Sequence, residues 1–421
     1  MSARKVELLV ERLAKSGDGV AQHEGRAVFV AGALPGERVT AELTESGKVL
    51  HAEVLERHTT SPERRPPACS LAETCGGCDW MHLQDDAQLR EKEEVVVSTL
   101  EHLAQLAPGS YERLPMVKSP RALGYRRRAA LHPVSGALGF HGRKSHERVA
   151  VKRCPALTPP LEAMPGTLAT ALGAAVLKEL EEVRLLECDG ALSASLHLKA
   201  QVRPKHRELV EALVRDGKFD GVVLHPGAGK GQPETFGTPE LEEEGVLHRP
   251  DGFAQANAEV NRQLVRAAVE LLDAGAGHRV LELYSGNGNF TFRLAAGAQS
   301  VVAVESHPLS VGLAQKAAQK RGIANVRFVQ GDSEKIANGF VREAERFDRL
   351  LVDPPRTGAP GVGKWASGIL ASRVVYVACD PASLARDAKD LAGQGFRPLA
   401  LQVFDLFPQT HHVEALMVFT R

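Results

Sequence analysis

The sequence predicts an α/β protein in which a parallel sheet wrapped by helices follows a small β-barrel and a mixed α+β region. Three observations lead to this fold class. Short strand-like runs fill about the first 62 residues, both helix and strand patterns occur up to about residue 250, and helices then alternate with strands. A chain of 421 residues has room for two or three domains. We expect their bounds at 1–62, 63–250 and 251–421.

Strand patterns in the first region are short and closely spaced. They cover residues 6–9, 27–30, 39–43 and 49–55, and turn sequences at 17–19, 35–36 and 46–47 separate them. Strands of this length and spacing favour a small barrel of the oligonucleotide-binding type. A proline-rich segment, 61–67, indicates a linker.

The middle region begins with a cysteine cluster and a charged helix expected over residues 86–106. Alternating apolar residues predict a strand at 192–198, and residues 205–217 predict a helix that ends in glycine. This part is therefore expected to be mixed α+β.

The last region opens with a helix at 259–274 and an apolar strand at 279–284. Further strands are expected after intervening helices, at 301–305, 326–331, 350–353 and 374–378. This alternation is typical of a parallel sheet. Only a loop separates the runs 399–407 and 413–419, so an antiparallel hairpin is expected to close the sheet.

Overall charge gives no sign of a nucleic-acid partner, because 52 Lys and Arg balance 52 Asp and Glu. Any RNA site must come from local clusters such as Tyr125-Arg126-Arg127-Arg128 and Arg143-Lys144. Such clusters are usually solvated faces, but beside an oligonucleotide-type barrel we expect phosphate contacts. The N-terminus lacks the apolar core of a signal peptide and no apolar run reaches the ~20 residues of a membrane helix, so a cytoplasmic protein is expected.

A nucleotide-type site is indicated where the first strand of the parallel sheet ends. Gly286 and Gly288 lie between this strand and a helix, where a ligand can approach the backbone. Glu305 ends the second strand and could accept from ribose hydroxyls, and Asp332 ends the third and could face an adenine. A nicotinamide dehydrogenase is the rival interpretation, weakened by Thr291 in place of a third glycine. A simple helix-capping loop with surface carboxylates is the other alternative.

Three reactive residues are expected at the same edge of the sheet. Asp353 opens Asp353-Pro354-Pro355-Arg356 after the fourth strand, Cys379 ends the fifth strand, and Glu414 lies in the last strand. Each has a plain structural alternative, namely a capping Asp in a rigid turn, a small buried hydrophobe and an exposed edge residue. The ligand edge of a parallel sheet is a poor place for inert core, which favours a chemical role for Cys379.

The remaining cysteines suggest a metal centre. Cys69, Cys75 and Cys78 are closely spaced around Gly76-Gly77, and Cys154 lies far downstream. Cysteines in a cytosolic chain of this length are more plausibly ligands or nucleophiles than disulfides. Spacing alone does not separate structural zinc from an iron–sulfur cluster. Cys188 is expected in the core.

Several motifs together give the chain a family resemblance. It resembles the RNA (uracil-5)-methyltransferases over nearly its whole length, especially the iron–sulfur-containing 23S ribosomal RNA members. Two residues depart mildly from the family pattern: Asp380 stands where the family often has Asn, and Ser285 stands where it often has Cys. The motifs are Phe253-Ala254-Gln255-Ala256-Asn257, Leu281-Glu282-Leu283-Tyr284-Ser285-Gly286-Asn287-Gly288-Asn289-Phe290-Thr291, Asp353-Pro354-Pro355-Arg356-Thr357-Gly358, Cys379-Asp380-Pro381-Ala382-Ser383-Leu384-Ala385-Arg386-Asp387 and His411-His412-Val413-Glu414.

The resemblance implies a class I, Rossmann-like methyltransferase domain that uses S-adenosylmethionine, preceded by a TRAM barrel that binds RNA. It places the nucleophile on Cys379 and the base on Glu414, and the chemistry leaves Asp353 as an organising carboxylate. It also favours a four-iron cluster, 4Fe-4S, over zinc on the four clustered cysteines. The implied cofactor contacts, with Gly286 from the glycine loop, are Gln255, Tyr284, Gly286, Asn289, Glu305, Asp332 and Asp353.

This set of residues suits methylation of carbon 5 of uracil, which is a poor nucleophile. A thiolate that adds to carbon 6 creates an enolate, and a base must later remove the carbon 5 proton. The expected partner is structured RNA, either 23S ribosomal RNA or the T-loop of transfer RNA, with no membrane and no obligate protein partner. Two other classes stay open: a non-catalytic RNA-binding protein with a metal site, and an oxidoreductase that uses a nicotinamide and the cluster.

Overall fold

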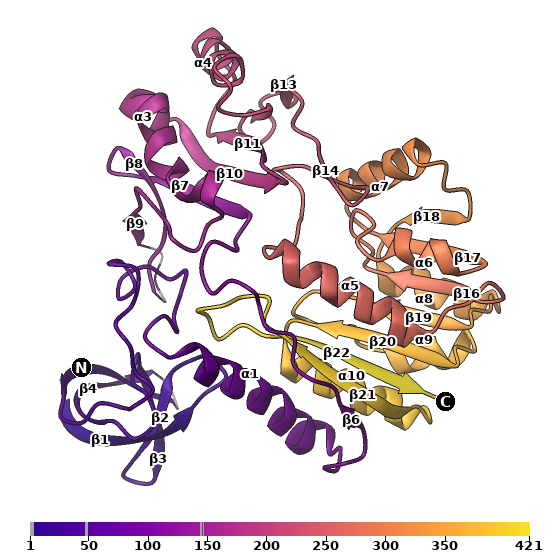
Figure 1. Cartoon of the computed structure of the whole chain (residues 1–421), viewed down its shortest axis with the longest axis horizontal. Helices are drawn as coiled ribbons and strands as arrows, with labels where there is room; N and C mark the ends of the chain where they lie inside the picture. Colours follow the sequence, from indigo (N-terminus) through magenta and orange to yellow (C-terminus); the bar gives the residue numbers. More distant parts are fainter. Residues whose placement is uncertain (1–3, 47–48, 144, 146) are drawn as a thin grey trace. The chain divides into compact units, whose positions relative to one another are not determined.

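The computed structural model describes residues 4–46, 49–143, 145 and 147–421, and Figure 1 shows its helices and strands. The chain forms two compact units. Unit 1 comprises residues 1–95, 141–149 and 407–412, and unit 2 comprises residues 96–140, 150–406 and 413–421. Among the described residues, no helix is both long enough and apolar enough to cross a membrane.

Unit 1 contains a closed five-stranded barrel, which confirms the predicted oligonucleotide-type barrel. Its strands follow the order β1-β2-β3-β5-β4. Alternate side chains of β1, among them Val6, Leu8 and Val10, point into the barrel core. The sequence had predicted four strands, and the one it missed is β2. The bounds are β1 Arg4–Leu13, β2 Gly19–His23, β3 Arg26–Ala31, β4 Arg38–Ser46 and β5 Val49–Arg57.

The segment after the barrel packs back onto it through buried polar contacts. Glu37 is fully buried and forms ion pairs with Arg57 (3.1 Å) and Arg64 (2.6 Å). The indole Nε1 of Trp80 donates to the Gly17 carbonyl at 3.0 Å, where φ is +81°. These contacts fix the region of Cys69, Cys75 and Cys78 against the barrel. The helix α1, Asp85–Thr99, then runs into unit 2 and continues as a π-helical turn, Leu100–Ala104.

The central part of unit 2 is mixed α+β, as expected. Its sheet contains strands in the order β13-β12-β11-β10-β7-β8, and leucines and valines from both the strands and α3 form its core. The strand and the helix predicted here are observed within a few residues, as β11 and α4. The bounds are β7 Arg128–Val134, β8 Ala137–His141, β9 Arg148–Ala150, α2 Pro159–Glu162, α3 Met164–Leu177, β10 Leu180–Cys188, β11 Ala191–Leu198, α4 Pro204–Arg215, β12 Gly221–His225 and β13 Glu234–Gly237.

The C-terminal part of unit 2 is the predicted Rossmann-like sheet. Its strands follow the order β18-β17-β16-β19-β20-β22-β21-β6, parallel from β18 to β20, with β22 antiparallel to both neighbours. In Figure 1, α5 lies across the near side of this sheet, and it packs on β19, β20 and β22. The bounds are β6 Glu112–Arg113, α5 Ala258–Leu272, β16 Arg279–Leu283, α6 Thr291–Gly297, β17 Ser300–Glu305, α7 Pro308–Lys320, β18 Val326–Gln330, α8 Ser333–Arg342, β19 Arg349–Val352, α9 Val362–Gly368, β20 Arg373–Ala378, α10 Pro381–Gly393, β21 Arg397–Phe404 and β22 Glu414–Thr420.

The strand order reverses at β16, which pairs with β17 on one side and β19 on the other. Ligands of open α/β sheets bind at such a switch point, outside the carboxyl ends of the strands. The strands β19 and β20 are almost entirely buried, so their ends are where polar side chains can reach a ligand. The topology therefore places the glycine loop, Asp353 and Cys379 along one edge.

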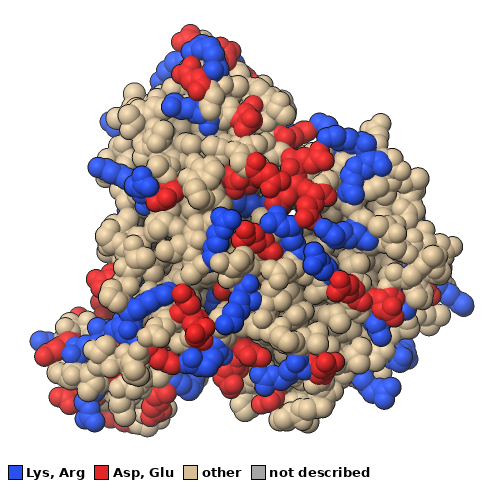
Figure 2. Space-filling model, in the orientation of Figure 1, with Lys and Arg blue, Asp and Glu red and all other residues tan. Residues whose placement is uncertain are grey.

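A short hairpin, β14 (Leu241–Glu243) and β15 (Val246–His248), precedes this sheet. Figure 2 shows acidic side chains gathered over β14 and basic side chains over the neighbouring α7. Ion pairs join the two groups: Lys316 with Glu240, and Lys320 with Glu242. Because these charges neutralise one another, this surface is not an unbalanced basic face for RNA.

Candidate active site

Strand pairing brings the three reactive residues of the sheet together. Cys379 directly follows β20, and Glu414 begins β22. The antiparallel register pairs Ala378 with Ala415, so Cys379 and Glu414 occupy neighbouring positions on adjacent strands. Asp353 directly follows β19, which pairs in parallel with β20. The predicted trio therefore shares one edge of the sheet.

Burial changes the acidity of all three groups. It raises the pKa of Asp353 to about 7. It also raises the pKa of Glu414 well above its usual range, with a further contribution from the charge of Asp353. Burial, followed by the charges of Glu414 and Asp353, raises the pKa of Cys379 to about 12, while Arg356 acts in the opposite direction. At neutral pH the site thus holds a thiol beside Asp353, which is partly ionised there and can take up the thiol proton.

The loop that carries Asp353 is anchored by α10. Asp387 is buried on this helix and accepts from the Tyr376 hydroxyl (2.5 Å) and from the Ala359 amide (2.7 Å). Gly358 adopts φ +73°, and a Cβ there would lie 2.4 Å from Nη2 of Arg386 and 2.5 Å from Oδ2 of Asp387. The glycine is therefore required by the close approach of helix and loop. Sequence reasoning assigned no role to Tyr376 or Asp387, although Arg386-Asp387 at the end of the Cys379 motif was an available signal.

The glycine loop offers open space beside a carboxylate. Gly286 adopts φ +57°, and a Cβ added there would meet nothing within 4 Å. Its amide donates to Oε2 of Glu305 at 2.9 Å, and Oε1 of Glu305 accepts from the His307 amide at 2.6 Å. An uncrowded backbone next to an oriented carboxylate suits the ribose of a nucleoside cofactor.

Tyr284 and Asp332 are positioned by the start of α8. Tyr284 has φ +62°, and its amide donates to the Ser333 hydroxyl at 3.3 Å. Asp332 caps α8 by accepting from the Lys335 amide at 2.9 Å. Burial, followed by the charge of Asp332, raises the pKa of Tyr284 to about 12. The two residues predicted to contact a cofactor therefore lie near each other at the ends of β16 and β18.

A buried acid beneath the glycine loop was missed by the sequence reasoning. Glu282 is fully buried in β16, and Thr291 donates its hydroxyl to Oε2 at 2.6 Å. Burial raises the pKa of Glu282 to about 8; the Thr291 hydrogen bond opposes the shift, and the charges of Asp353 and Glu305 add to it. An acidic residue in the middle of an apolar strand was the sequence feature that could have drawn attention to Glu282. Thr291 stands where a dinucleotide-binding pattern would have its third glycine, and its hydroxyl is used here to bind Glu282.

The other two predicted cofactor residues are held by neighbouring elements. Asn289 exchanges two hydrogen bonds with Asn261 of α5, at 2.9 and 3.1 Å. The backbone carbonyl of Gln255 accepts from Nε of Arg127 at 2.8 Å. Asn289 also lines a cavity of about 300 Å³, and neither Glu305 nor Asp332 is among its described lining residues.

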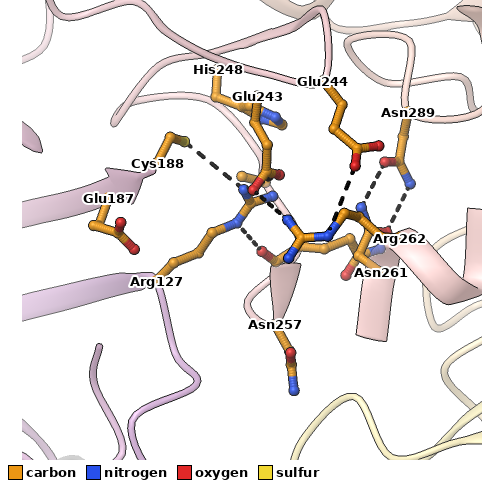
Figure 3. Close-up of polar contacts among 12 residues, drawn as sticks. Arg127, Glu187, Cys188, Glu243, Glu244, His248, Asn257, Asn261, Arg262 and Asn289 are labelled. Atoms are coloured by element: carbon orange, nitrogen blue, oxygen red, sulfur yellow. Dashed lines mark hydrogen bonds and ion pairs between the residues drawn. The ribbon is translucent and has the colours of Figure 1, made fainter. Parts of the chain in front are cut away.

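The prediction of phosphate contacts is wrong for Arg127. This residue is 2% exposed and forms a buried ion pair with Glu243, while its Nη1 also lies 3.9 Å from Sγ of Cys188, as Figure 3 shows. Arg128 donates to the Ala254 carbonyl at 2.9 Å. A partner 116 residues away in the sequence holds Arg127 inside, so the local charge pattern could not reveal its burial. The expected core position of Cys188 is confirmed.

The second basic cluster lies in unit 1. Arg143 donates to the Asp79 carbonyl at 3.3 Å, and Lys144 is outside the described residues. A further acid–base pair in this unit joins Asp79 to His411, and their hydrogen bond lowers the pKa of Asp79 against the effect of burial.

The clustered cysteines do not by themselves define a metal centre. All six cysteines lie in the described part of the chain and none forms a disulfide. Sγ of Cys69 accepts from the Leu71 amide at 3.4 Å. Within the described ranges, no group of three or more His, Cys, Asp or Glu side chains is arranged to hold a metal ion.

Comparisons with known proteins show the family of this chain. A family model described as tRNA (Uracil-5-)-methyltransferase matches residues 247–421, and a TRAM domain model matches residues 1–55. The chain is 36% identical to the 23S rRNA (uracil(1939)-C(5))-methyltransferase RlmD of Pseudomonas entomophila, over 99% of this chain and 94% of that protein. The enzyme of the same name from Shewanella denitrificans is 34% identical over 99% of this chain and 96% of that protein.

The fold also matches a solved structure. A crystal structure of Pyrococcus abyssi tRNA (uracil-54, C5)-methyltransferase in complex with S-adenosyl-L-homocysteine aligns with a TM-score of 0.75 and 22% identity, covering 99% of this chain and all of that one. At this identity the likeness shows the shared fold. The extent and identity of the curated matches go further: this chain belongs to the RNA (uracil-5)-methyltransferase family and carries a TRAM domain at its N-terminus.

Proposed function

We propose that this enzyme methylates carbon 5 of a uridine in 23S ribosomal RNA, with S-adenosylmethionine as methyl donor and Cys379 as nucleophile. The observation that carries the proposal is the meeting of Cys379, Glu414 and Asp353 at the carboxyl edge of the sheet. The full-length similarity to enzymes named for uracil 1939 of 23S rRNA supports ribosomal RNA as the substrate.

The proposed cofactor site follows the edge from β16 to β18. Glu305 would accept from the ribose hydroxyls, Asp332 and Tyr284 would flank the adenine, and Gly286 leaves the backbone open for close approach. Gln255, Asn289 and Asp353 are the remaining proposed contacts. S-adenosylmethionine supplies an electrophilic methyl group when it is bound there.

The chemistry begins with proton transfer from the Cys379 thiol to a neighbouring carboxylate, and Asp353, whose pKa is about 7, is suited to this step. The thiolate then forms a bond to carbon 6 of uracil, which makes carbon 5 nucleophilic enough to take the methyl group. Glu414, acting as a carboxylate, removes the carbon 5 proton. The electrons of that C–H bond re-form the ring double bond and expel the Cys379 thiolate.

The roles of the other regions are proposals as well. We assign residues 1–62 to an RNA-binding barrel, 63–250 to a central domain with RNA contacts and 251–421 to the catalytic domain. A four-iron cluster on Cys69, Cys75, Cys78 and Cys154 rests on their spacing and on the family resemblance, and no catalytic step depends on it. A cytoplasmic location stays a prediction from the sequence.

A covalent trap tests the nucleophile. RNA that carries 5-fluorouridine at the target should form a stable adduct with the unaltered enzyme, because fluorine cannot leave as a cation. Denaturing gels would show it as a protein band shifted by the mass of the RNA. The Cys379→Ala variant should give no adduct and no methylation, and Cys188→Ala, which removes a buried thiol away from the site, should still give the adduct.

The same assay distinguishes the substrates. Transcripts of 23S ribosomal RNA should be methylated, and transfer RNA transcripts should not. Methylation confined to the T-loop of transfer RNA would overturn the ribosomal assignment while leaving the chemistry intact. An adduct that persists in Cys379→Ala would mean that another group is the nucleophile, and binding of S-adenosylmethionine and RNA without any turnover would favour a non-catalytic role.

A further inference from the structure

A buried histidine ends the short hairpin that precedes the parallel sheet. His248, labelled in Figure 3, is the last residue of β15 and is 4% exposed. Its ring contacts two segments proposed to hold S-adenosylmethionine, the glycine loop after β16 and the segment 253–257 that carries Gln255. Buried polar side chains are normally hydrogen-bonded, so the partners of His248 indicate what it holds in place.

One ring nitrogen of His248 contacts the glycine loop. The side-chain amide nitrogen of Asn287, a residue that is 4% exposed, lies 3.0 Å from Nδ1 of His248 and 2.7 Å from the Leu247 carbonyl oxygen. A carbonyl oxygen can only accept, so the amide nitrogen donates to it and offers its second N–H to Nδ1. Nδ1 is therefore an acceptor, and His248 is a neutral imidazole with its proton on Nε2.

The other ring nitrogen contacts the second segment. His248 hydrogen-bonds the Phe253 carbonyl, which accepts the Nε2 proton. Phe253 lies two residues before Gln255 in the sequence. Burial, followed by the charge of Arg127, lowers the pKa of His248 to about 3, in agreement with the neutral ring that the first contact requires. Both hydrogen bonds therefore fit one tautomer of the imidazole.

The glycine loop has a backbone that needs such an anchor. Gly286 and Gly288 have φ values of +57° and +97°, in the left-handed region. Glycine reaches this region easily, but it also loses more conformational freedom than other residues when it is ordered. Asn287 stands between the two glycines, and its side chain holds the loop to β15 through His248 and Leu247.

We propose that His248 is a positioning residue for S-adenosylmethionine: as a neutral imidazole it ties the glycine loop to the segment that carries Gln255, and so orders both before the cofactor binds. Each segment supplies proposed cofactor contacts, Gly286 on one and Gln255 on the other. A site that is ordered in advance loses less conformational entropy on binding. This inference rests on the proposed function, because those contacts do.

The test measures S-adenosylmethionine binding to the full-length protein by calorimetry. His248→Phe keeps a ring but has neither donor nor acceptor, so affinity should fall about three- to thirtyfold. His248→Asn can place an amide oxygen near the position of Nδ1 and accept from Asn287, so it should recover part of this loss. His206→Phe is the matched control and should leave affinity unchanged. His206 is also buried in unit 2 and uses both ring nitrogens, one with the Arg203 amide and one with Glu179.

Turnover separates a positioning role from general damage. In His248→Phe the KM for S-adenosylmethionine should rise in step with the loss of affinity. The kcat at saturating cofactor should stay within about twofold of the unaltered enzyme, because Cys379, Glu414 and Asp353 are unchanged. A lower kcat at an unchanged KM would mean a smaller active fraction and would overturn the proposal.

Asn287→Leu tests the same hydrogen bond from the side of the loop, and it replaces His248→Phe if that variant does not fold. The two changes together should cost no more affinity than the larger one alone, because they remove one contact. Full additivity would mean that the two residues act separately, and would overturn the tie.

Nitrogen NMR of histidine-labelled protein checks the tautomer, with the His248 signals identified by their absence from His248→Phe. From about pH 5 to pH 8, Nδ1 should be unprotonated and Nε2 protonated. An imidazolium, or a proton on Nδ1, would overturn the proposal.

The two proposals can fail separately. If the unaltered protein binds S-adenosylmethionine and His248→Phe binds it equally well, His248 has no positioning role and the proposed function stands. If the unaltered protein does not bind S-adenosylmethionine at all, the proposed function fails, and this role of His248 fails with it.

Discussion

Burial raises the pKa values of all three proposed catalytic residues, Asp353, Cys379 and Glu414. A thiol and two carboxyl groups that would be charged in water at mildly basic pH are kept closer to neutral. A carboxylate with a raised pKa is a stronger base, which suits proton removal from sulfur and carbon. The sequence predicted which residues meet, because strand ends of a parallel sheet share an edge. It could not predict their pKa values, which depend on packing around Glu414 and Asp353.

Activity should rise with pH through the neutral range. The reaction needs Asp353 and Glu414 as carboxylates, since Asp353 takes the proton of the Cys379 thiol and Glu414 takes the carbon 5 proton, and both become deprotonated as pH increases. Below the pKa of about 7 for Asp353, kcat/KM should increase about tenfold per pH unit. Steady-state methylation between pH 5.5 and 9 would measure this. A rate that falls over that range would contradict the assigned roles.

Replacing Glu414 by glutamine should block product release and also stabilise the protein at alkaline pH. The pKa of Glu414 is raised in the folded state, so the folded protein binds more protons than the unfolded one above pH 4.5. Stability from this group is therefore present at low pH and lost as pH rises. Glu414→Gln removes that loss, and the Tm at pH 8 should increase by about 2–4 °C relative to the unaltered enzyme, with little change at pH 5.

In the same variant the carbon 5 proton has no acceptor, so the enzyme should accumulate as a covalent adduct with methylated RNA. Thermal unfolding and denaturing gels check the two effects separately. Glu343→Gln, at an exposed acid on the same sheet domain, is the control and should change neither. Normal turnover by Glu414→Gln would place the base elsewhere, with Asp353 the first group to examine.

At the scale of elements, the predicted parallel sheet is confirmed because apolar strands alternate with helices over a long stretch. The missed features depend on contacts between distant segments. β2 is a short strand after a glycine turn, and it needs β1 and β3 to be recognised. The anchoring of the Asp353 loop by Asp387 joins a loop to a helix that begins 28 residues later. Local patterns cannot show such pairings.

Loss of the Tyr376 hydroxyl should loosen the catalytic loop without affecting cofactor binding. Tyr376→Phe removes the donor to the buried carboxylate of Asp387, which also holds the Ala359 amide. The expected cost is about 1–3 kcal/mol of unfolding free energy, as for a buried polar group left short of a partner. The kcat should fall while the dissociation constant for S-adenosylmethionine stays the same.

Urea unfolding, turnover and calorimetry of cofactor binding would test this variant. Tyr111→Phe, at another buried tyrosine of unit 2, is the control and should keep its kcat. If Tyr376→Phe weakened cofactor binding and left kcat unchanged, Asp387 would act on the cofactor site and not on the loop that carries Asp353.

For the whole molecule, a net charge of zero follows from equal numbers of acidic and basic residues and does not tell which of them face solvent. Arg127 and Glu243 form a buried pair, which removes from the surface a charge that the sequence suggested for RNA. Composition and spacing could predict the fold class and that Asp353, Cys379 and Glu414 share one edge of the sheet. They could not separate surface arginines from internal ones, because this depends on a partner that only the folded chain supplies.

The last prediction concerns the cysteine cluster. Protein purified without oxygen should contain iron and sulfide, and Cys78→Ser should lose both, while Cys188→Ala, which removes a buried core thiol, should keep them. The proposed ligands Cys69, Cys75 and Cys78 all lie in the segment between β5 and α1. The hydrogen bond from Trp80 to Gly17 and the ion pair of Arg64 with Glu37 hold the two ends of this segment against the barrel. The middle of the segment consists mainly of turns.

Loss of the cluster should therefore expose residues 66–79 to proteases before any other part of unit 1, and should lower the Tm, because a bound metal centre adds its binding free energy to folding. Affinity for S-adenosylmethionine should not change, since none of the four cysteines is among the proposed cofactor residues. Limited proteolysis with mass spectrometry, elemental analysis and calorimetry give the three readouts. Stoichiometric zinc without iron would replace the cluster by a structural zinc site, and protein with neither metal that resists proteolysis in this segment would mean that packing alone holds it.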